Sequence, residues 1–414
     1  NKFFMNSKFF LSVVIFAILI LASCSDDQVL NTDVGDTIKQ EHSQNANFIP
    51  NQYIVVLKND ALKNIDARYV NQDNYDQLKQ EFQSEVHGFL SEKRIQITQP
   101  NEVFIKVLKG FSATLTPSEL LALQGDRRVD FIEQEQVITV EGNQSLAVSC
   151  ADNLSEIVPC GVTKVQGGMP YTGGKKAFII DTGIDLNHVD LHVSNSLKFN
   201  AVKTGPEKGK PQDLHGHGTH VAGIVGAIAN NNKGVVGVAA GVELVAVKVL
   251  NKYGSGSLAG VVSGIDYVAS HGEAGDVANM SLGGGISSTL DLAVFNASSN
   301  GIWFTLAAGN SASDANFTSP ARINGPYILT ISAANCTGNF ASFSNWGNPP
   351  VDFAAPGVNV CSTYLNSGYI SFSGTSMAAP HAAGVLLQTN GAPQSCDQVT
   401  NDPDGNPDNL ICIY

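Results

Sequence analysis

The stretch Ala177-Phe178-Ile179-Ile180-Asp181-Thr182-Gly183 places four apolar residues in a row and ends them with a carboxylate, a hydroxyl and a glycine. Further short, continuously apolar runs follow at residues 244–249, 277–280, 302–306 and 328–333. Strands without alternation of polar and apolar residues are typical of a parallel sheet buried on both faces. Helical patterns at residues 219–229 and 290–299 separate these runs. The sequence therefore predicts an α/β domain whose parallel sheet is covered by helices on both faces.

Two other stretches carry groups that could act with Asp181. Ser376 lies in Ser373-Gly374-Thr375-Ser376-Met377-Ala378-Ala379-Pro380-His381, at the start of an apolar helical run. A serine there meets the positive end of the helix dipole, although a plain N-cap serine is the alternative. His217, in His215-Gly216-His217-Gly218-Thr219-His220, also opens a helix. The end of a strand and the starts of two helices can meet at one edge of a sheet. Ser376 would then be the nucleophile, His217 the base and Asp181 the acid that orients it.

Each of these clusters has another interpretation. Asp181-Thr182-Gly183 matches the aspartic-protease signature, but that chemistry needs a second carboxylate motif, which the sequence lacks. His215, His217 and His220 could bind zinc, yet no His-Glu-x-x-His spacing accompanies them. The Ser376 stretch lacks the last glycine of the hydrolase elbow and the lysine of the β-lactamases.

Residues 51–140 have a different pattern and form a separate small domain. Strands are expected at residues 52–57, 103–108, 111–115 and 129–140. A long amphipathic helix is expected from Tyr75 to Leu90, and the capping box Thr116-Pro117-Ser118-Glu119 opens a shorter helix through Leu123. The order βαββαβ predicts an α+β, ferredoxin-like domain. Residues 141–154 are interpreted as a junction with the following domain.

The N-terminal segment predicts export. Lys2 and Lys8 precede an apolar run over residues 9–22, which is the pattern of a signal peptide rather than of a spanning helix. Leu21-Ala22-Ser23-Cys24 resembles the bacterial lipobox, after which Cys24 would carry lipid; an ordinary signal peptide with a chance cysteine is the alternative. Residues 25–50 are polar and aperiodic, as in a flexible tether.

Charge and composition restrict the partners. Lys+Arg 24 against Asp+Glu 37 gives a net charge of −13, with 43% hydrophobic residues. This balance argues against nucleic acid and against electrostatic binding to anionic lipid, so contact with a membrane is expected only through the lipid anchor.

Six cysteines remain besides Cys24. An even number in an exported chain predicts disulfides, with free buried thiols as the alternative. We expect pairing between neighbours in the sequence, namely Cys150 with Cys160, Cys336 with Cys361, and Cys396 with Cys412.

In combination, the three motifs resemble those of the subtilisin-like serine proteases, in the family's chain order Asp, His, Ser. The resemblance covers residues 155–390, is somewhat closer to the proteinase K branch, and extends to residues 51–140, which resemble the family's inhibitory propeptide. It implies that Ser376 attacks the scissile carbonyl, that His217 moves the proton and that Asp181 orients the imidazole. Asn310 matches the side-chain donor of the oxyanion hole; a turn asparagine is the alternative.

The resemblance also implies binding sites. Two stretches would pair with the substrate backbone as an added strand: Ser281-Leu282-Gly283-Gly284 and Gly254-Ser255-Gly256. A structural calcium site would take oxygens from Glu156, Asp190, Ala229, Asn231, Lys233 and Val235. A surface turn with solvated acids is the alternative there, and the acidic loop at residues 401–408 is interpreted as a solvated turn.

Two departures from the family pattern stand out. Cys160 occupies a position where the family usually has an aromatic residue, and only 38 residues follow Ser376. Residues 391–414 form a short tail with Cys396 and Cys412 in place of the family's longer C-terminal elements, and a disulfide there would reinforce that end.

The resulting expectation is a secreted serine endopeptidase of broad, mainly apolar preference, made as a self-processing lipoprotein zymogen. It would act on proteins or peptides, bind its own propeptide, work as a monomer and need no cofactor for catalysis. Cleavage between Val140 and Cys150 would also separate the enzyme from its lipid anchor. A non-catalytic binding or inhibitory lipoprotein with the same fold is the alternative, and the complete set of catalytic residues argues against it.

Overall fold

The computed structural model describes residues 47–62, 66–95, 100–140, 143–152 and 155–414, with the backbone alone for residues 143–148. The expected signal peptide, Cys24 and most of the tether lie outside these residues. None of the helices within the described ranges is long and apolar enough to cross a membrane.

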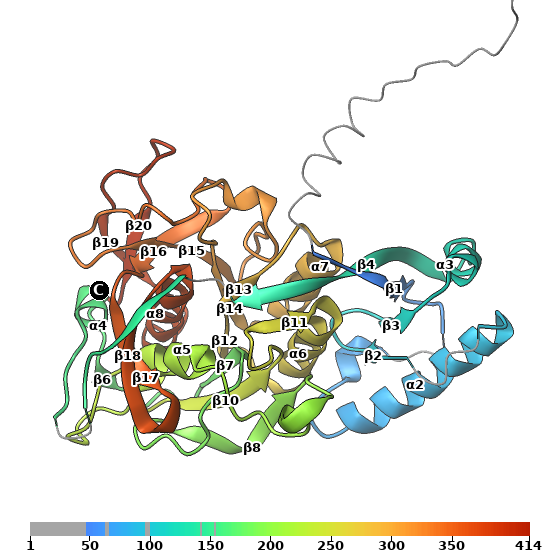
Figure 1. The fold of residues 1–414 in the computed structure, drawn as a ribbon, viewed down its shortest axis with the longest axis horizontal. Helices are drawn as coiled ribbons and strands as arrows, with labels where there is room; N and C mark the ends of the chain where they lie inside the picture. Colours follow the sequence, from blue (N-terminus) through green and yellow to red (C-terminus); the bar gives the residue numbers. More distant parts are fainter. Residues whose placement is uncertain (1–46, 63–65, 96–99, 141–142, 153–154) are drawn as a thin grey trace, which may run out of the picture. The chain divides into compact units, whose positions relative to one another are not determined.

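A nine-stranded sheet forms the centre of the larger domain (Figure 1). Its order is β19-β20-β16-β15-β14-β12-β7-β10-β8, and every pairing is parallel except that of β19 with β20. The strands are β7 (Lys176–Asp181), β8 (Val193–Asn200), β10 (Glu243–Lys248), β12 (Val277–Met280), β14 (Trp303–Ala307), β15 (Ile328–Ala334), β16 (Val351–Pro356), β19 (Gln394–Gln398) and β20 (Asn409–Cys412). All five apolar runs identified in the sequence form neighbouring strands of this sheet.

Helices cover both faces of the sheet, as the apolar runs require. Successive side chains of a strand point to opposite faces, and β7 shows this directly: Phe178 and Ile180 belong to one hydrophobic cluster, Ala177 and Ile179 to the other. The first cluster contains α6 (Leu258–His271) and α7 (Ser288–Ser298), and the second contains α5 (His217–Gly226) and α8 (Thr375–Gln388). The expected α/β class is confirmed.

The smaller domain has the expected ferredoxin-like order. Its elements are β1 (Phe48–Leu57), α2 (Tyr75–Glu92), β2 (Glu102–Phe104), β3 (Gly110–Thr114), α3 (Pro117–Gln124) and β4 (Val129–Val140), and its antiparallel strands lie in the order β4-β1-β3-β2. The capping box forms at α3, where the Thr116 N–H donates to Glu119 Oε2 at 2.8 Å.

Short strands connect the two domains. β4 extends beyond its own sheet and pairs with β11 (Ser255–Ser257) and β13 (Leu282–Gly283) of the larger domain (Figure 1). β5 (Asn143–Ser149) follows and pairs with β18 (Gly368–Ser373), which in turn pairs with β17 (Val360–Tyr364). Part of the expected junction is therefore a strand, because β18 offers it an open edge. The remaining elements are α4 (Cys160–Lys164), β6 (Met169–Pro170) and β9 (Ala239–Ala240).

The predicted disulfide pairing is correct for one bond and wrong for two. Cys396 bonds to Cys412, as expected, but Cys150 bonds to Cys361 and Cys160 to Cys336. Cys150 follows β5, and the ladder β5-β18-β17 brings it beside Cys361 in β17. Distance along the chain is a poor guide here because parallel sheets join strands that are far apart in the sequence.

The C-terminal tail completes the main sheet. β20 pairs parallel to β16, with Leu410 opposite Ala354, and Leu410 and Ile411 are buried. The loop before it is not the fully solvated turn that we expected, because the Asp408 carboxylate is buried and accepts the Ser332 hydroxyl. Burial raises the pKa of Asp408 to about 7.

Candidate active site

Asp181 and His217 meet at the carboxyl edge of the sheet. Asp181 is the last residue of β7 and His217 the first of α5. His217 Nδ1 lies 2.8 Å from Asp181 Oδ1 and 3.0 Å from Oδ2, and both side chains are buried. The contact places the proton of a neutral imidazole on Nδ1 and leaves Nε2 as the nitrogen that accepts another.

Asp213 shapes the turn that leads into α5. Its Oδ1 accepts the N–H groups of His215 (2.8 Å) and Gly216 (2.9 Å), and its Oδ2 accepts the Thr219 N–H and hydroxyl. Gly216 has φ 101°, and a Cβ on it would lie 2.0 Å from the Tyr364 ring. Only glycine fits this turn, so Gly216 and Asp213 together fix where His217 begins its helix.

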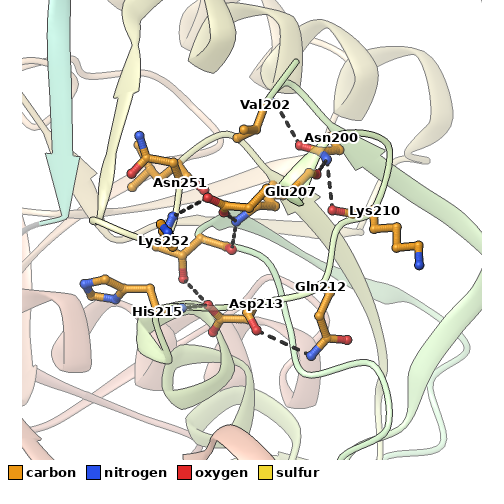
Figure 2. Close-up of polar contacts among 12 residues, drawn as sticks. Asn200, Val202, Glu207, Lys210, Gln212, Asp213, His215, Asn251 and Lys252 are labelled. Atoms are coloured by element: carbon orange, nitrogen blue, oxygen red, sulfur yellow. Dashed lines mark hydrogen bonds and ion pairs between the residues drawn. The ribbon is translucent and has the colours of Figure 1, made fainter. Parts of the chain in front are cut away.

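A buried ion pair supports the same region. Lys248 ends β10 opposite Asp181 and is fully buried; its Nζ lies 2.9 Å from Glu207 Oε2 and donates to Thr182 O at 2.6 Å. Figure 2 shows Glu207 on the segment between β8 and α5, where its Oε1 accepts the Lys252 N–H at 3.1 Å. The Lys248–Glu207 ion pair therefore holds the segment before α5 against β10, the strand next to Asp181.

We expect Lys248→Met to destabilise the fold by about 3–5 kcal/mol, because it leaves the Glu207 carboxylate buried without its cation. Urea unfolding, performed in an inactive Ser376→Ala background to prevent digestion, measures the change. The double variant Lys248→Met with Glu207→Gln is the control and should recover much of the loss. A single variant as stable as the parent would contradict this account of the pair.

Ser376 is the second residue of α8, which packs against α5. Its Oγ donates to Ser281 O at 3.3 Å, and the Ser281 hydroxyl donates to Ser376 O at 2.8 Å. Asn310, just after β14, accepts the Thr375 N–H through Oδ1 at 2.8 Å. Its buried Nδ2 has no hydrogen-bond partner among the described residues. Beside the serine there is therefore an amide nitrogen whose donors are unused.

The two expected substrate-binding stretches bind β4. Ser255, Gly256 and Ser257 pair with Thr139, Ile138 and Val137, and Leu282 and Gly283 pair with Val140 and Thr139. The Val140 N–H also donates to Gly254 O at 2.9 Å. A Cβ on Gly284 would lie 2.7 Å from Ile138 Cδ1, so the missing side chain makes room for this fully buried isoleucine. The smaller domain thus occupies both expected substrate-binding stretches with its own last strand.

β4 ends and β5 begins near the serine. Val140 is paired with Leu282, the neighbour of the Ser281 that contacts Ser376, and Asn143 is paired with Ser373 on the strand that leads into α8. Glu141 and Gly142 lie outside the described residues. The segment between β4 and β5 is therefore bracketed on both sides by strands that end near Ser376.

Acidic groups join the smaller domain to α6 and α7. Glu133 accepts the Thr289 N–H (2.8 Å) in the first turn of α7, and Glu135 accepts the Ala259 N–H (3.0 Å) in that of α6. Carboxylates are favoured at helix N-termini because the helix dipole is positive there. In return, Asp266 of α6, which is fully buried, accepts three consecutive N–H groups of the smaller domain, those of Ile105, Lys106 and Val107.

These contacts predict that the smaller domain is held less tightly at higher pH once the chain is cut. Burial raises the pKa of Glu135 from 4.5 to about 7 in the complex. A carboxyl whose pKa is raised on binding takes up a proton in the complex, so binding is tightest below pH 4.5 and weakens as the pH rises to 7. Size-exclusion of the processed complex at about pH 5 and about pH 8 should show more dissociation at the higher pH. Glu135→Gln should reduce this pH dependence. Equal retention of the smaller domain at both pH values would contradict the prediction.

The expected calcium residues lie together. Asp190 is buried; its Oδ1 accepts the Asn231 side-chain amide at 2.6 Å and its Oδ2 the Val235 N–H at 3.1 Å. Glu156 accepts the Asn231 N–H at 2.9 Å. The Asn231 oxygen, however, accepts the Lys233 N–H rather than facing the carboxylates. Burial raises the pKa of Asp190 to about 6, and the nearby Glu156 adds to the shift.

This arrangement fits a cation in part. The Glu156 and Asp190 carboxylates, from two other segments, both contact the loop at residues 229–235 that holds Ala229, Lys233 and Val235. A positive ion would relieve the cost of burying Asp190. Within the described part of the chain, no group of three or more His, Cys, Asp or Glu side chains is placed to hold a metal. By the same finding, His215, His217 and His220 are not arranged as the zinc-binding cluster that was the alternative interpretation of the sequence.

Comparison with known proteins identifies the family. The sequence model of the subtilase family matches residues 174–400, which include Asp181, His217, Asn310 and Ser376. The chain belongs to the subtilase family. The model of peptidase inhibitor I9 matches residues 52–141, so the smaller domain of this subtilase corresponds to an inhibitory propeptide.

Relatives of this subtilase are named as serine proteases. It is 36% identical to an alkaline serine exoprotease A of Vibrio alginolyticus over 83% of this chain, and spans 61% of that protein's length. It is 34% identical to an extracellular serine proteinase of a Thermus species, over 90% of this chain and 87% of the relative. The crystal structure of a cold adapted subtilisin-like serine proteinase matches with 36% identity and a TM-score of 0.52, over 62% of this chain and 97% of the other.

Sequence reasoning missed the residues that support the site. Asp213, Glu207 and Lys248 carry no motif, and only their burial identifies them. A lysine at the end of an apolar strand is the single signal in the sequence, since such a side chain must find a partner inside the protein.

Proposed function

We propose that this subtilase is a secreted serine endopeptidase that cuts peptide bonds through an acyl-enzyme formed on Ser376. One observation carries the proposal: near Ser376 the chain's own β4 is added as a strand to β11 and β13, and β5 is added to β18, the strand that leads to the serine. A polypeptide bound as an added strand is the geometry of a peptide substrate.

The side chains around this backbone have the roles of a hydrolytic triad. The Ser376 oxygen attacks the carbonyl while His217 accepts its proton at Nε2, and Asp181, bonded to Nδ1, stabilises the imidazolium that forms. The Asn310 Nδ2 donates to the oxygen that becomes negative in the tetrahedral intermediate. His217 then gives the proton to the leaving amine, and water hydrolyses the ester by the same steps in reverse order.

We further propose that the protein is a zymogen that cuts itself. Within the expected 140–150 range we place the processing bond among the three peptide bonds between Val140 and Asn143, a choice that the pairing of β4 with β13 and of β5 with β18 supports. Ile138 fills an enclosed position beside Gly284 two residues before this segment, which supports a preference for apolar residues on that side of the bond.

Labelling with a serine-directed phosphonylating reagent tests the catalytic proposal. The processed protein should gain one adduct on Ser376, located by peptide mass spectrometry, and Ser376→Ala should gain none. Failure of the processed wild-type protein to react would favour the alternative, a binding or inhibitory lipoprotein with a protease fold.

We propose that Glu156, Asp190 and Asn231 bind a calcium ion that stabilises the fold. The ion would take the two carboxylates and carbonyl oxygens of the loop, and would lower the cost of burying Asp190. We expect a chelator to lower the melting temperature of the wild type, and Asp190→Asn to remove that response. Asp352→Asn, at a carboxyl on β16 that accepts the Thr330 N–H, is the control and should keep this response. A wild type whose melting temperature ignores both chelator and added calcium would refute the site.

Export as a lipoprotein, followed by release on cleavage, completes the proposal. One relative is named as an extracellular serine proteinase, and a cut between Val140 and Asn143 would separate Cys24 from Ser376. Mass analysis of cell-associated and released fractions tests the order of events. An active, processed enzyme that still carries lipid would contradict the release.

A further inference from the structure

The strand β5 lies on the leaving-group side of the proposed cut. It pairs with β18 through Asn143 opposite Ser373, Val148 opposite Ser371 and Ser149 opposite Ile370. Ser373 is three residues before Ser376, so β5 begins near the serine and leads away from it along β18, whereas β4 pairs with β11 and β13. The β18 edge is thus where the residues after the scissile bond of any peptide substrate would pair.

A covalent bond holds the far end of this strand. Cys150 follows β5 directly and is bonded to Cys361 in β17, the other neighbour of β18. Beyond the disulfide, the Asp152 carbonyl accepts the Gly234 N–H at 2.9 Å. Cutting a bond before Asn143 breaks neither the ladder nor these attachments.

The two products of the cut therefore differ in how they are held. The propeptide becomes a separate chain, bound only by non-covalent contacts, and dilution removes it. The residues after the cut remain part of the enzyme, and a tether this short keeps them at an effective concentration on the order of mM beside β18. Dilution does not lower that concentration.

We propose that residues 143–149 stay on β18 after processing as a disulfide-tethered strap, which competes with the leaving-group side of peptide substrates. The inference rests on the proposed function and deepens it. Once the propeptide has gone, the strap covers the edge of β18 but leaves those of β11 and β13 open. It therefore competes only with substrates whose residues after the scissile bond pair with β18. The mature enzyme is then efficient on substrates that bind mainly through the residues before the scissile bond.

Two matched substrates test the strap in the processed full-length product. One is a peptide p-nitroanilide that binds only on the β11 and β13 side; the other is an internally quenched peptide with the same sequence extended by several residues beyond the cut. Removing the disulfide with Cys150→Ser and Cys361→Ser should raise kcat/KM for the extended peptide, since the strap is then held only through the peptide chain and the longer tether lowers its effective concentration. The p-nitroanilide value should not change.

Two further variants separate tethering from general stability. Cys396→Ser with Cys412→Ser removes the tail disulfide and should leave the ratio of the two kcat/KM values as in the wild type. Val148→Pro keeps both cysteines but weakens the ladder to β18, and should raise the ratio even where the first double variant folds poorly. Hydrogen exchange should show the β18 amides that face β5 protected in the processed wild type and exposed in Val148→Pro, while those that face β17 stay protected in both.

The outcomes are distinct. An unchanged ratio in both strap variants, or a mature chain that begins at or after Cys150, overturns the strap and leaves the protease proposal intact. No cleavage of the p-nitroanilide by the wild type, with no phosphonyl adduct, overturns the protease proposal and the competition with it.

Discussion

Ser376→Ala is expected to accumulate as one uncut chain with no peptidase activity. Without the hydroxyl oxygen, no acyl-enzyme can form, and loss of a triad serine costs about 10⁶-fold in kcat, a magnitude measured in subtilisin itself. Because β4 ends and β5 begins near the chain's own serine, the same loss should abolish processing. Intact mass and N-terminal sequencing of the purified protein measure both effects in one experiment.

The control for this experiment is Ser299→Ala, at the exposed end of α7, which should mature like the wild type. Wild-type enzyme added in trace amounts should cut the Ser376→Ala protein slowly or not at all, since the strands on both sides of its scissile segment are paired with its own β11, β13 and β18. Maturation of Ser376→Ala without any added protease would show that another enzyme makes the cut, and self-processing would be wrong.

Asn310→Ala is expected to lower kcat by about 10²–10³-fold with little change in KM, the range known for removal of an oxyanion donor in subtilisin. The Nδ2 group has no partner among the described residues, so its donors are available for the charge that appears only in the intermediate. An interaction made only in the transition state affects kcat rather than KM.

Stopped assays with a p-nitroanilide peptide separate the two constants. Asn300→Ala, an exposed asparagine after α7, is the matched control and should behave like the wild type. Since Asn310 Oδ1 also accepts the Thr375 N–H, the thermal stability of Asn310→Ala must be measured alongside. A rise in KM with kcat intact would show that Asn310 binds substrate and does not stabilise the intermediate.

Much of the architecture could be predicted because local patterns determine it. The run before Asp181 is apolar on both faces of its strand, and the structure buries Phe178 and Ile179 in opposite clusters. The capping box at Thr116 and the strand that ends at Val140 also have local causes, and both are found where the sequence places them.

What could not be predicted depends on contacts between distant segments. Nothing near Cys150 in the sequence shows that β18 will bring Cys361 beside it, so the pairing of neighbours was a poor guide. Glu133 and Glu135 look like ordinary exposed acids on a strand, and their partners are the starts of α7 and α6. Asp408 likewise appears solvated until β20 joins β16 and buries it.

The way in which β4 occupies the cleft has a consequence for self-digestion. Its backbone pairs with β11 on one side and β13 on the other, so a substrate must offer several consecutive residues whose N–H and C=O groups are not already used. Strands and helices of a folded protein fail that requirement unless they first open, and the free energy of opening is added to the barrier for cleavage. An enzyme with little discrimination among side chains would therefore discriminate strongly by conformation, degrading unfolded chains while compact ones, including other copies of itself, survive.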